Sequence, residues 1–340
     1  MNPTLTIAMP CYNTQAYLDQ CFDSLLDKVA GVEIVAIDDG STDGTWATLQ
    51  DYAQRWPETA RVFHQENAGW GGAINHAIAE ARGTFLLVLD SDDHLDVDIL
   101  AQIVSKLEEL EADGAQVDLF VSNFVYDHVL DHTARQISYR KMMPRDEVFT
   151  WKDVGKPGIS EYFMMHAITY RTQILRDSGL RLPEHAAYMD SIFTLHPLPY
   201  VRNIYYMDAD LYYYLIGREG QSIEVDVLEK HIDEQLLATR TVIDDFDYQE
   251  LCGRDPRLAN SVARYISAMM TVSTIYLFKI NTPESIRQCK EIWAYLKKHD
   301  RAMHRQVSRS LAGLVNRHTA LGRTCARCGY DLTNKVFKFA

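Results

Sequence analysis

Apolar and polar residues follow two different periods along the first 125 residues. Short strand-like runs with an apolar centre lie at 5–10, 33–41, 60–66, 84–93 and 117–127, and several of them end in polar residues. Between these runs apolar residues recur every three or four positions, as in helices with one buried face, over 17–29, 44–55, 73–81 and 99–110. Strands that alternate with helices predict a mainly parallel sheet covered by helices on both faces.

The pattern changes in the second half of the chain. Residues 128–160 read as strand and loop, and residues 161–216 alternate short helix and strand signals. From about residue 226 the period is helical. The stretch 262–278 is unusually apolar but too short to span a bilayer, so we expect a buried helix there.

The strand-like run FLLVLDSDD, residues 85–93, ends in three crowded carboxylates: Asp90, Asp92 and Asp93. Like charges repel, so this cluster is costly unless a cation or a proton lies among them. In an extended chain Asp90 and Asp92 lie on one side with Ser91 opposite, and two such carboxylates suit Mg²⁺ or Mn²⁺. The alternative is that DSDD caps the helix that begins near Asp96.

A second acidic pair, Asp38 and Asp39, ends the strand at 33–41 and precedes GSTDGT. Turn and cap chemistry is the alternative explanation for this pair too. The first strand ends in PCYN. Ligands of parallel sheets bind outside the carboxyl ends of the strands, so these polar ends predict one shared site.

Composition narrows the class of protein. The 340 residues carry a formal net charge of −13, which argues against general nucleic-acid binding. The chain has no apolar run of spanning length, and its first residues, MNPTLTIAMP, have neither a basic region nor a long apolar segment, so we expect neither a spanning helix nor a secretory signal. Its six cysteines fit a reducing cytosol. The Cys325 and Cys328 pair has no second C-x-x-C partner, so reduced thiols are favoured over zinc. Residues 281–340 are basic, with 12 Lys and Arg against 4 Asp and Glu.

Five segments in order resemble the family 2 glycosyltransferases. They are IAMPCYNTQAYLDQCFDSLL, EIVAIDDGSTDGT, ENAGWGGAINHAI, LLVLDSDDHLD and LPEHAAYMDSIFTLHPL. The resemblance implies an α/β GT-A fold, Rossmann-like and mainly parallel, that uses nucleotide-diphosphate sugars. We therefore expect a GT-A domain over 1–222 and a helical C-terminal extension over 223–340.

The resemblance also implies which residues contact the nucleotide. Asp39 would accept a hydrogen bond from the base, as the family does with uracil. Pro10, Tyr12 and Asn13 would sit beside the nucleotide. Asn67 would lie near the donor. Asp39 makes UDP-sugars the expected donors.

Further donor contacts are expected on three other segments. Gly71 and Gly72 would let the backbone approach the donor, because a Cβ would hold the ligand away; a tight turn into the next helix is the alternative. Ser91 would contribute from the acidic strand end. Arg218 and Ser222, in GREGQSI, would contact the diphosphate, and a guanidinium suits phosphate.

An inverting family 2 enzyme needs a metal and a general base. Asp92 is the expected direct ligand of Mg²⁺ or Mn²⁺, with Asp90 nearer the ribose or the waters of the metal. In the family the base is an acid in a Glu-Asp-aromatic motif, matched here by YMDSIF, so Asp190 is expected to be the base. Met189 replaces the usual Glu. The alternative role for Asp190 is a helix N-cap.

The resemblance to the family and the basic C-terminal helices lead to expectations about the acceptor and about where the protein acts. The family implies an acceptor hydroxyl on a cell-surface glycan or lipid-linked saccharide of the cell envelope. The basic C-terminal helices predict a cytoplasmic enzyme in peripheral contact with the inner face of the plasma membrane. A homo-oligomer that buries these helices between subunits is the alternative. Two other functions are alternatives. One is a non-catalytic scaffold in a glycan synthase complex. The other is a sugar nucleotidyltransferase, which should show a glycine-rich loop after the first strand, whereas MPCYNTQ has no glycine there.

Overall fold

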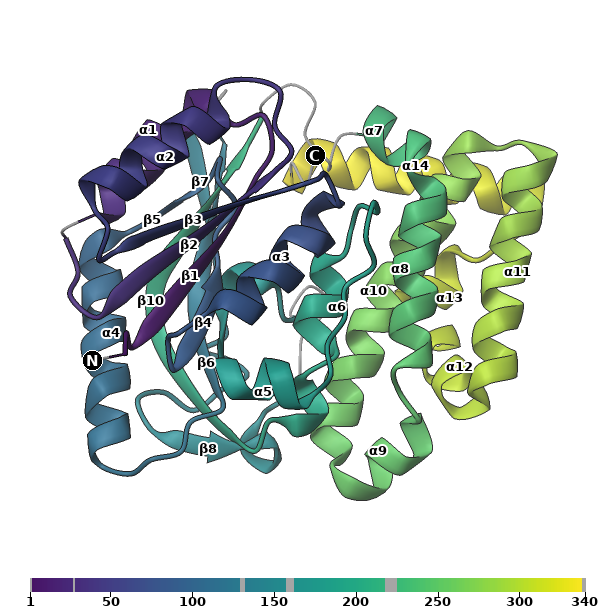
Figure 1. Ribbon diagram of the computed structural model, residues 1–340. Helices are drawn as coiled ribbons and strands as arrows, with labels where there is room; N and C mark the ends of the chain where they lie inside the picture. Colours follow the sequence, from purple (N-terminus) through teal and green to yellow (C-terminus); the bar gives the residue numbers. More distant parts are fainter. Residues whose placement is uncertain (1, 27, 129–131, 157–161, 218–224, 338–340) are drawn as a thin grey trace. The chain divides into compact units, whose positions relative to one another are not determined.

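The structure, a computed structural model, describes residues 2–26, 28–128, 132–156, 162–217 and 225–337. The chain divides into two compact units. The first consists of Met1–Gly155 and Phe163–Ile216, drawn from purple to teal in Figure 1. The second consists of Lys156–Tyr162 and Gly217–Ala340, and most of it is drawn from green to yellow.

The first unit is built on a ten-stranded mixed sheet. Its parallel half has the order β3-β2-β1-β4, and these strands are β1 (Leu5–Cys11), β2 (Val32–Asp39), β3 (Ala60–Gln65) and β4 (Phe85–Val88). Every residue of β1, β2 and β4 is buried. This burial explains the continuous apolar runs, because helices cover both faces of a parallel sheet.

The other half of the sheet contains antiparallel strands. After β4 the order continues β9-β6-β10-β5, while β7 pairs with β6 and β8 pairs with β10. The strands are β5 (His94–Leu95), β6 (Leu119–His128), β7 (Thr133–Ile137), β8 (Val148–Thr150), β9 (Ile168–Arg171) and β10 (Asn203–Ile216). β10 runs parallel to β6, with irregular register between Tyr206 and Tyr212.

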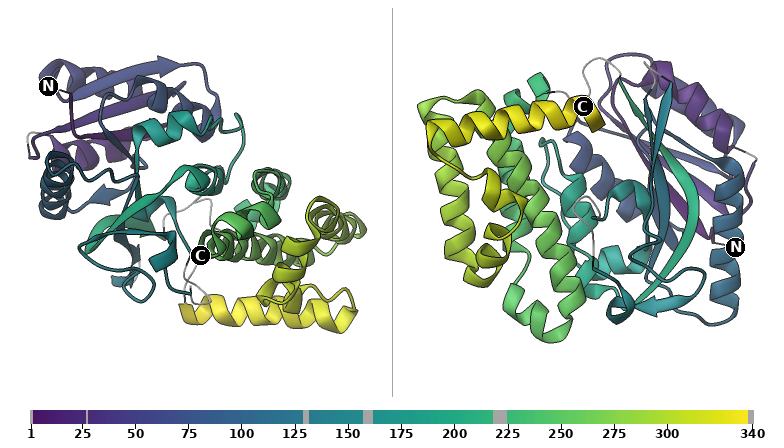
Figure 2. Two further views of the ribbon diagram at one scale, coloured as in Figure 1. Left: turned by 90° about the horizontal axis from the view of Figure 1, so that it is seen from below. Right: turned by 180° about the vertical axis from the view of Figure 1, so that it is seen from behind.

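Helices cover both faces of this sheet (Figures 1 and 2). On one face lie α1 (Gln15–Leu25), α2 (Thr45–Arg55) and α4 (Val97–Ala112). On the other lie α3 (Gly69–Glu80), α5 (Thr172–Asp177) and α6 (Asp190–Leu195). Three 3₁₀ turns complete the unit: η1 (Trp151–Asp153), η2 (Met165–Ala167) and η3 (Leu198–Tyr200). The predicted α/β fold with a mainly parallel central sheet is confirmed.

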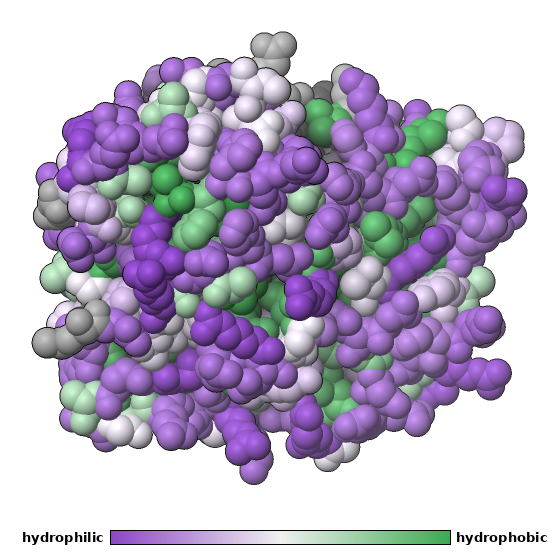
Figure 3. Space-filling view, in the orientation of Figure 1, coloured by the Kyte–Doolittle hydropathy of each residue, from purple (hydrophilic) through white to green (hydrophobic). Residues whose placement is uncertain are grey.

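The second unit is helical in its described part, as predicted. It contains α7 (Val225–Lys230), α8 (Ile232–Asp244), α9 (Tyr248–Arg254), α10 (Pro256–Ile280), α11 (Pro283–His299), α12 (Arg301–Ser308), α13 (Leu311–Val315) and α14 (Ala320–Phe337). The long helix α10 packs against α8, α9, α11 and α13, and it contains the apolar stretch 262–278. Among the described residues, no helix combines the length and hydrophobicity needed to cross a membrane. Figure 3 shows one face of the molecule, which is largely hydrophilic with small separate apolar areas.

One predicted strand ends earlier than expected. β4 stops at Val88, five residues before the end of the predicted run. The backbone N–H of Asp93 donates to the carbonyl of Asp90 at 3.0 Å, which closes a turn over 90–93. The chain then continues into β5, which pairs with β10. The expectation that Asp90 and Asp92 share one side of an extended strand is therefore wrong.

The cap of α4 is also settled by the structure. Asp96 Oδ1 accepts hydrogen bonds from the backbone N–H groups of Asp98 and Ile99, both at 3.0 Å. Asp96, and not the DSDD cluster, is thus the N-cap residue of this helix. The crowding of carboxylates at 90–93 needs another explanation.

A single buried carboxylate, Glu33 on β2, joins several elements of the sheet. Its Oε1 accepts hydrogen bonds from Thr6 Oγ1 and from the backbone N–H of Arg82, both at 2.6 Å. Its Oε2 lies 3.3 Å from the guanidinium of Arg61 on β3. One side chain therefore connects β1, β2, β3 and the segment that leads into β4.

We predict that Glu33→Ala lowers the free energy of unfolding by about 3 kcal/mol, because it leaves buried donors without an acceptor. Urea unfolding followed by circular dichroism measures this change. Glu109→Ala, which removes an exposed pair with Lys106, is the control and should leave the midpoint nearly unchanged. Equal midpoints for the two variants would contradict the role of Glu33.

Candidate active site

Three parallel strands end at one edge of the sheet and carry the predicted site residues beyond it. β1 lies between β2 and β4, so the segments after these strands are neighbours. In the sheet, β2 and then β3 lie on one side of β1, and β4 lies on its other side. Ligands of α/β sheets bind at such a switch point. Asp39 and the 90–93 turn are therefore on a common edge, as predicted.

Asn13 holds the loop after β2 in place. It adopts a left-handed conformation with φ of 52°, which Asn tolerates better than most residues. Its Oδ1 accepts a hydrogen bond from the backbone N–H of Thr42 at 2.8 Å, and its own N–H donates to Ser41 Oγ at 3.0 Å. Its neighbour Tyr12 is 51% exposed and presents an aromatic ring at the same edge.

The carboxylate of Asp39 is fixed through one of its oxygens. Oδ1 accepts hydrogen bonds from Gln65 Nε2 at 2.7 Å and from the backbone N–H of Ala68 at 2.8 Å. Asn67 Nδ2 donates to the backbone carbonyl of Asp39 at 2.9 Å. The other carboxylate oxygen, Oδ2, has no hydrogen-bond partner in the described part of the chain. The carboxylate of Asp39 is thus held in one orientation, and its Oδ2 is available as a hydrogen-bond acceptor.

The adjacent Asp38 has a different role. It is fully buried, and its Oδ2 lies 2.6 Å from Nδ1 of the half-exposed His64 on β3. Its Oδ1 accepts from the backbone N–H of Ser41 at 3.3 Å. Asp38 therefore stabilises the loop, and Asp39 is the member of the pair with a spare acceptor.

The two predicted glycines are explained by packing within the protein. A Cβ on Gly71 would lie 2.3 Å from the carbonyl oxygen of Pro183, and one on Gly72 would lie 2.4 Å from the Cβ of Ala68. The backbone N–H of His185 also donates to the carbonyl of Ala68 at 2.7 Å. The first turn of α3 therefore fits closely against residues 182–185, the segment that leads to Asp190.

The carboxylates of the 90–93 turn lie in separate environments. Asp93 is buried, and it accepts hydrogen bonds from the Tyr212 hydroxyl at 2.7 Å and the Leu215 backbone N–H at 2.9 Å. Burial raises the pKa of the Asp93 carboxyl well above its ordinary value, and the charges of Asp92 and Asp90 raise it further. Asp93 is thus the structural member of the cluster.

Asp90 and Asp92 are half-buried and closer to solvent than Asp93. Asp90 Oδ1 accepts a hydrogen bond from Trp70 Nε1 at 2.8 Å. Trp70 also contacts Phe193 of α6 edge to face, with ring centroids 6.5 Å apart. Trp70 therefore links α3, the acidic turn and the helix that begins with Asp190.

His166, in η2, adds a nitrogen ligand to this region. Its ring is buried against those of Tyr212 and Tyr214, and its Nδ1 has no hydrogen-bond partner among the residues that the structure describes. Burial lowers the pKa of His166 to about 3, so the imidazole is neutral. One ligand atom each from Asp90, Asp93 and His166 lie within 4.8 Å of one another. Neutral imidazole and carboxylate oxygens fit a divalent cation, and the orphaned Nδ1 supports this fit.

Asp190 is the first residue of α6, and its side chain is half-buried. Burial raises the pKa of its carboxyl above the ordinary value, while backbone N–H groups at 190 and 191 partly oppose the shift. Met189 occupies the N-cap position, and no side-chain cap is formed. The alternative role of Asp190 as an N-cap is therefore wrong.

Two predicted nucleotide contacts are less accessible than expected. Pro10 and Ser91 are buried, and Ser91 hydrogen-bonds the thiol of the buried Cys11. Arg218 and Ser222 lie outside the described residues. No sequence signal distinguishes Trp70 or Tyr212, although Trp70 lies inside the segment ENAGWGGAINHAI. His166 has no sequence signal, because it is a single histidine in an apolar stretch.

Comparison with known proteins agrees with this geometry. Residues 6–166 match the family model described as Glycosyl transferase family 2. The uncharacterized glycosyltransferase EpsJ of Bacillus subtilis is 26% identical over 275 residues, which cover 75% of this chain and 74% of EpsJ. The poly(ribitol-phosphate) beta-glucosyltransferase of Bacillus spizizenii is 26% identical over 227 residues, 65% of this chain but only 33% of that protein.

A solved structure shows the same fold. The crystal structure of Staphylococcus aureus TarS 1–349 in complex with UDP-GlcNAc superposes with a TM-score of 0.58 at 20% identity, and the alignment covers 90% of each chain. The GT-A fold expected from the sequence is thereby confirmed. Residues 6–166 thus carry the match to glycosyl transferase family 2, and the chain is a glycosyltransferase.

Proposed function

We propose that this glycosyltransferase moves a sugar, with inversion, from a UDP-sugar to an acceptor hydroxyl of a cell-surface glycan or lipid-linked saccharide. One observation carries the proposal: Asp39, the 90–93 turn and the helix of Asp190 are joined around the first turn of α3. Ala68 contacts Asp39, and Trp70 contacts both Asp90 and α6. Base recognition, diphosphate binding and proton removal would thus occur at one edge.

The hydrogen bonds of Asp39 support a uracil base. Oδ1 is held by Gln65 and Ala68, so Oδ2 is available to accept the N3–H of uracil. The exposed ring of Tyr12 at the same edge supplies a stacking surface. The complex of TarS with UDP-GlcNAc supports the same donor class.

The leaving diphosphate requires positive charge. A divalent cation, Mg²⁺ or Mn²⁺, would neutralise the charge that grows on it. We propose that Asp92 and Asp90 hold this cation, with Asp90 common to that pair and to the group with Asp93 and His166. Arg218 and Ser222 stay proposed as further contacts to the phosphates.

Asp190 is proposed as the general base. A carboxyl whose pKa is raised by burial is a stronger base once it is ionised, which suits removal of a hydroxyl proton. The side chain of Met189 is buried, so a Glu there would bury a second charge. The Met therefore leaves Asp190 as the one acid of the YMDSIF motif.

The acceptor is proposed from the names of the relatives. Two of them are named as enzymes that act on poly(ribitol-phosphate). We infer a polysaccharide or lipid-linked acceptor of the cell envelope, used at the cytoplasmic face of the membrane. The chain spans only about a third of those relatives, so their further parts contribute nothing to this inference.

UDP binding tests the donor. We predict that UDP with Mn²⁺ raises the melting temperature of the wild type more than GDP or dTDP does. Asp39→Asn should abolish the UDP effect: its amide oxygen would take the place held by Gln65 and Ala68, and its NH₂ would then oppose the uracil N–H. Asp113→Asn, at the exposed end of α4, is the matched control. An unchanged UDP shift in Asp39→Asn would refute the assignment.

Donor hydrolysis separates an enzyme from a non-catalytic scaffold. We predict slow release of UDP from the preferred UDP-sugar with Mn²⁺ and no acceptor, detected by a coupled UDP assay. Asp92→Asn should abolish this release because the diphosphate loses its metal. A protein that binds UDP-sugar but never releases UDP, with or without acceptor, would instead be a scaffold.

The pH dependence of transfer tests the base. Because Asp190 must be ionised, kcat/KM should fall as pH decreases through a midpoint above the ordinary Asp value of 3.8. Asp190→Asn should lower transfer at least a hundredfold while the UDP-induced thermal shift persists. Glu184→Gln, an exposed neighbour, is the control. Full transfer activity in Asp190→Asn would exclude this base.

A further inference from the structure

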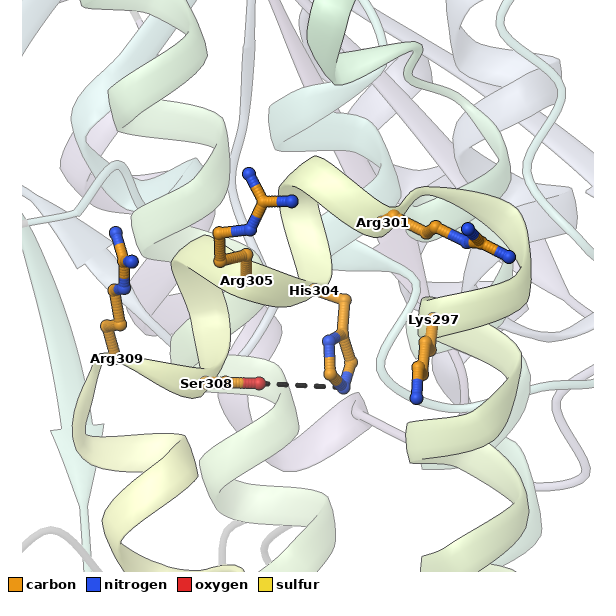
Figure 4. A pocket seen from close by; sticks show the side chains of 6 residues that line it. All are labelled: Lys297, Arg301, His304, Arg305, Ser308 and Arg309. Atoms are coloured by element: carbon orange, nitrogen blue, oxygen red, sulfur yellow. Dashed lines mark hydrogen bonds between the residues drawn. The ribbon is translucent and has the colours of Figure 1, made fainter.

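The corner between α11 and α12 forms a strongly basic pocket. Its volume is about 330 Å³, and Figure 4 shows its lining side chains on the end of α11 and along α12. The lining residues are Lys297, Arg301, His304, Arg305, Ser308 and Arg309. The four cations recur at every fourth position: Lys297 lies in the last turn of α11, Arg301 and Arg305 lie on one face of α12, and Arg309 is the C-cap residue of α12.

These four cations have no ion-pair partner among the described residues. Arg287, on the same α11, provides the contrast, because it pairs with Glu284 at 2.7 Å and Glu291 at 3.5 Å. Asp300 is the nearest carboxylate in sequence. It is occupied as the cap of α12, where Oδ1 accepts from the backbone N–H groups of 302 and 303, and Oδ2 accepts from that of 248.

His304 does not contribute to this charge at neutral pH. Burial lowers the pKa of its imidazole, and the charge of Lys297 lowers it further. Its ring approaches the hydroxyl of Ser308 at 3.5 Å, the contact drawn in Figure 4. The pocket therefore presents guanidinium and ammonium groups together with neutral polar atoms, a combination suited to phosphate oxygens.

Exposed leucines follow directly after this pocket. Leu311 and Leu314 of α13 are 47% and 64% exposed, and Leu321 at the start of α14 is 75% exposed. Leu311 is only two residues from Arg309, and α12 packs against α13. A basic helix face that only contacts water gives no reason for exposed leucines next to it. Basic residues next to exposed large apolar ones are typical of surfaces that lie on anionic membranes.

We propose that the 297–309 pocket and the leucines of α13 dock the second unit on a membrane that contains anionic phospholipid. Headgroup phosphates bind the four cations, and Leu311 and Leu314 enter the apolar boundary of the bilayer. The charge of the chain supports this occupant, because residues 281–340 carry a net charge of +8 within a protein of net −13. The docking goes beyond the proposed transfer reaction and needs neither donor nor acceptor.

Vesicle flotation of the full chain tests this surface. The protein should float with vesicles of phosphatidylcholine and phosphatidylglycerol at low salt, but not with phosphatidylcholine alone, and high salt should release it. Each basic residue near such a surface contributes about a fivefold change in partitioning. Arg301→Gln combined with Arg305→Gln should thus lower the partition coefficient about thirtyfold. Leu314→Ser should lower it separately.

Arg287→Gln combined with Lys290→Gln is the matched control, since it removes two charges from α11 outside the pocket and should bind vesicles nearly as the wild type does. The UDP-induced thermal shift of every variant checks the fold independently of vesicle binding.

Wild-type protein that never floats, or an Arg301/Arg305 variant that floats normally, would overturn the proposal. A change in oligomeric state of that variant by light scattering would instead identify a subunit interface, and capture by soluble polyphosphate without vesicle binding would identify a polyanion site. Either result also overturns membrane docking, and neither bears on glycosyl transfer.

Discussion

The electrostatic crowding of Asp90, Asp92 and Asp93 is the constraint around which the edge of the sheet is organised. Three adjacent carboxylates cannot all be buried and ionised. The protein separates them by ending β4 at Val88 and turning the chain, so that Asp93 enters the interior against Tyr212 and Leu215. Asp90 and Asp92 stay half-buried at the edge, where a cation is favourable. The arrangement of the three carboxylates at the site therefore depends on the early end of β4.

The partners of Asp93 depend on an irregularity in β10. Its register with β6 shifts between Tyr206 and Tyr212, as in a β-bulge, and bulges redirect the side chains that follow them. Asn123 holds the shift by donating to Asp208 Oδ1 at 2.9 Å and Asp210 Oδ1 at 3.0 Å. Tyr212 and Leu215 then reach the acidic turn. A polar network between β6 and β10 thus supports the carboxylates of the 90–93 turn, and Tyr212 of β10 lies 119 residues from Asp93 in sequence.

The periodicity of the sequence predicted β1 to β4, β6 and α1 to α4 within the first 125 residues, because burial on both faces imposes a continuous apolar run, but it gave no firm assignment for the strands after β6. It failed at the end of β4, since Leu89 still bonds Ala8 and looks like strand, while the turn depends on a hydrogen bond between Asp90 and Asp93. The acidic pairs could be placed at one edge from topology alone. The contacts of Trp70, His166 and Tyr212 could not, because each joins segments that are far apart in the chain. Likewise Gly71 reads as a ligand-facing glycine until Pro183 is seen against it.

This protein has a net negative charge, so its proposed binding to an anionic membrane raises the question of long-range electrostatic repulsion between the two. Residues 1–280 carry a net charge of −21, and residues 281–340 carry +8. At physiological ionic strength the Debye length is about 8 Å, so charges further from a surface than this contribute little. The four cations of the 297–309 pocket lie within a few turns of helix and have no ion-pair partners among the described residues. Their local field therefore determines which surface they can approach, and the net charge of the whole chain does not.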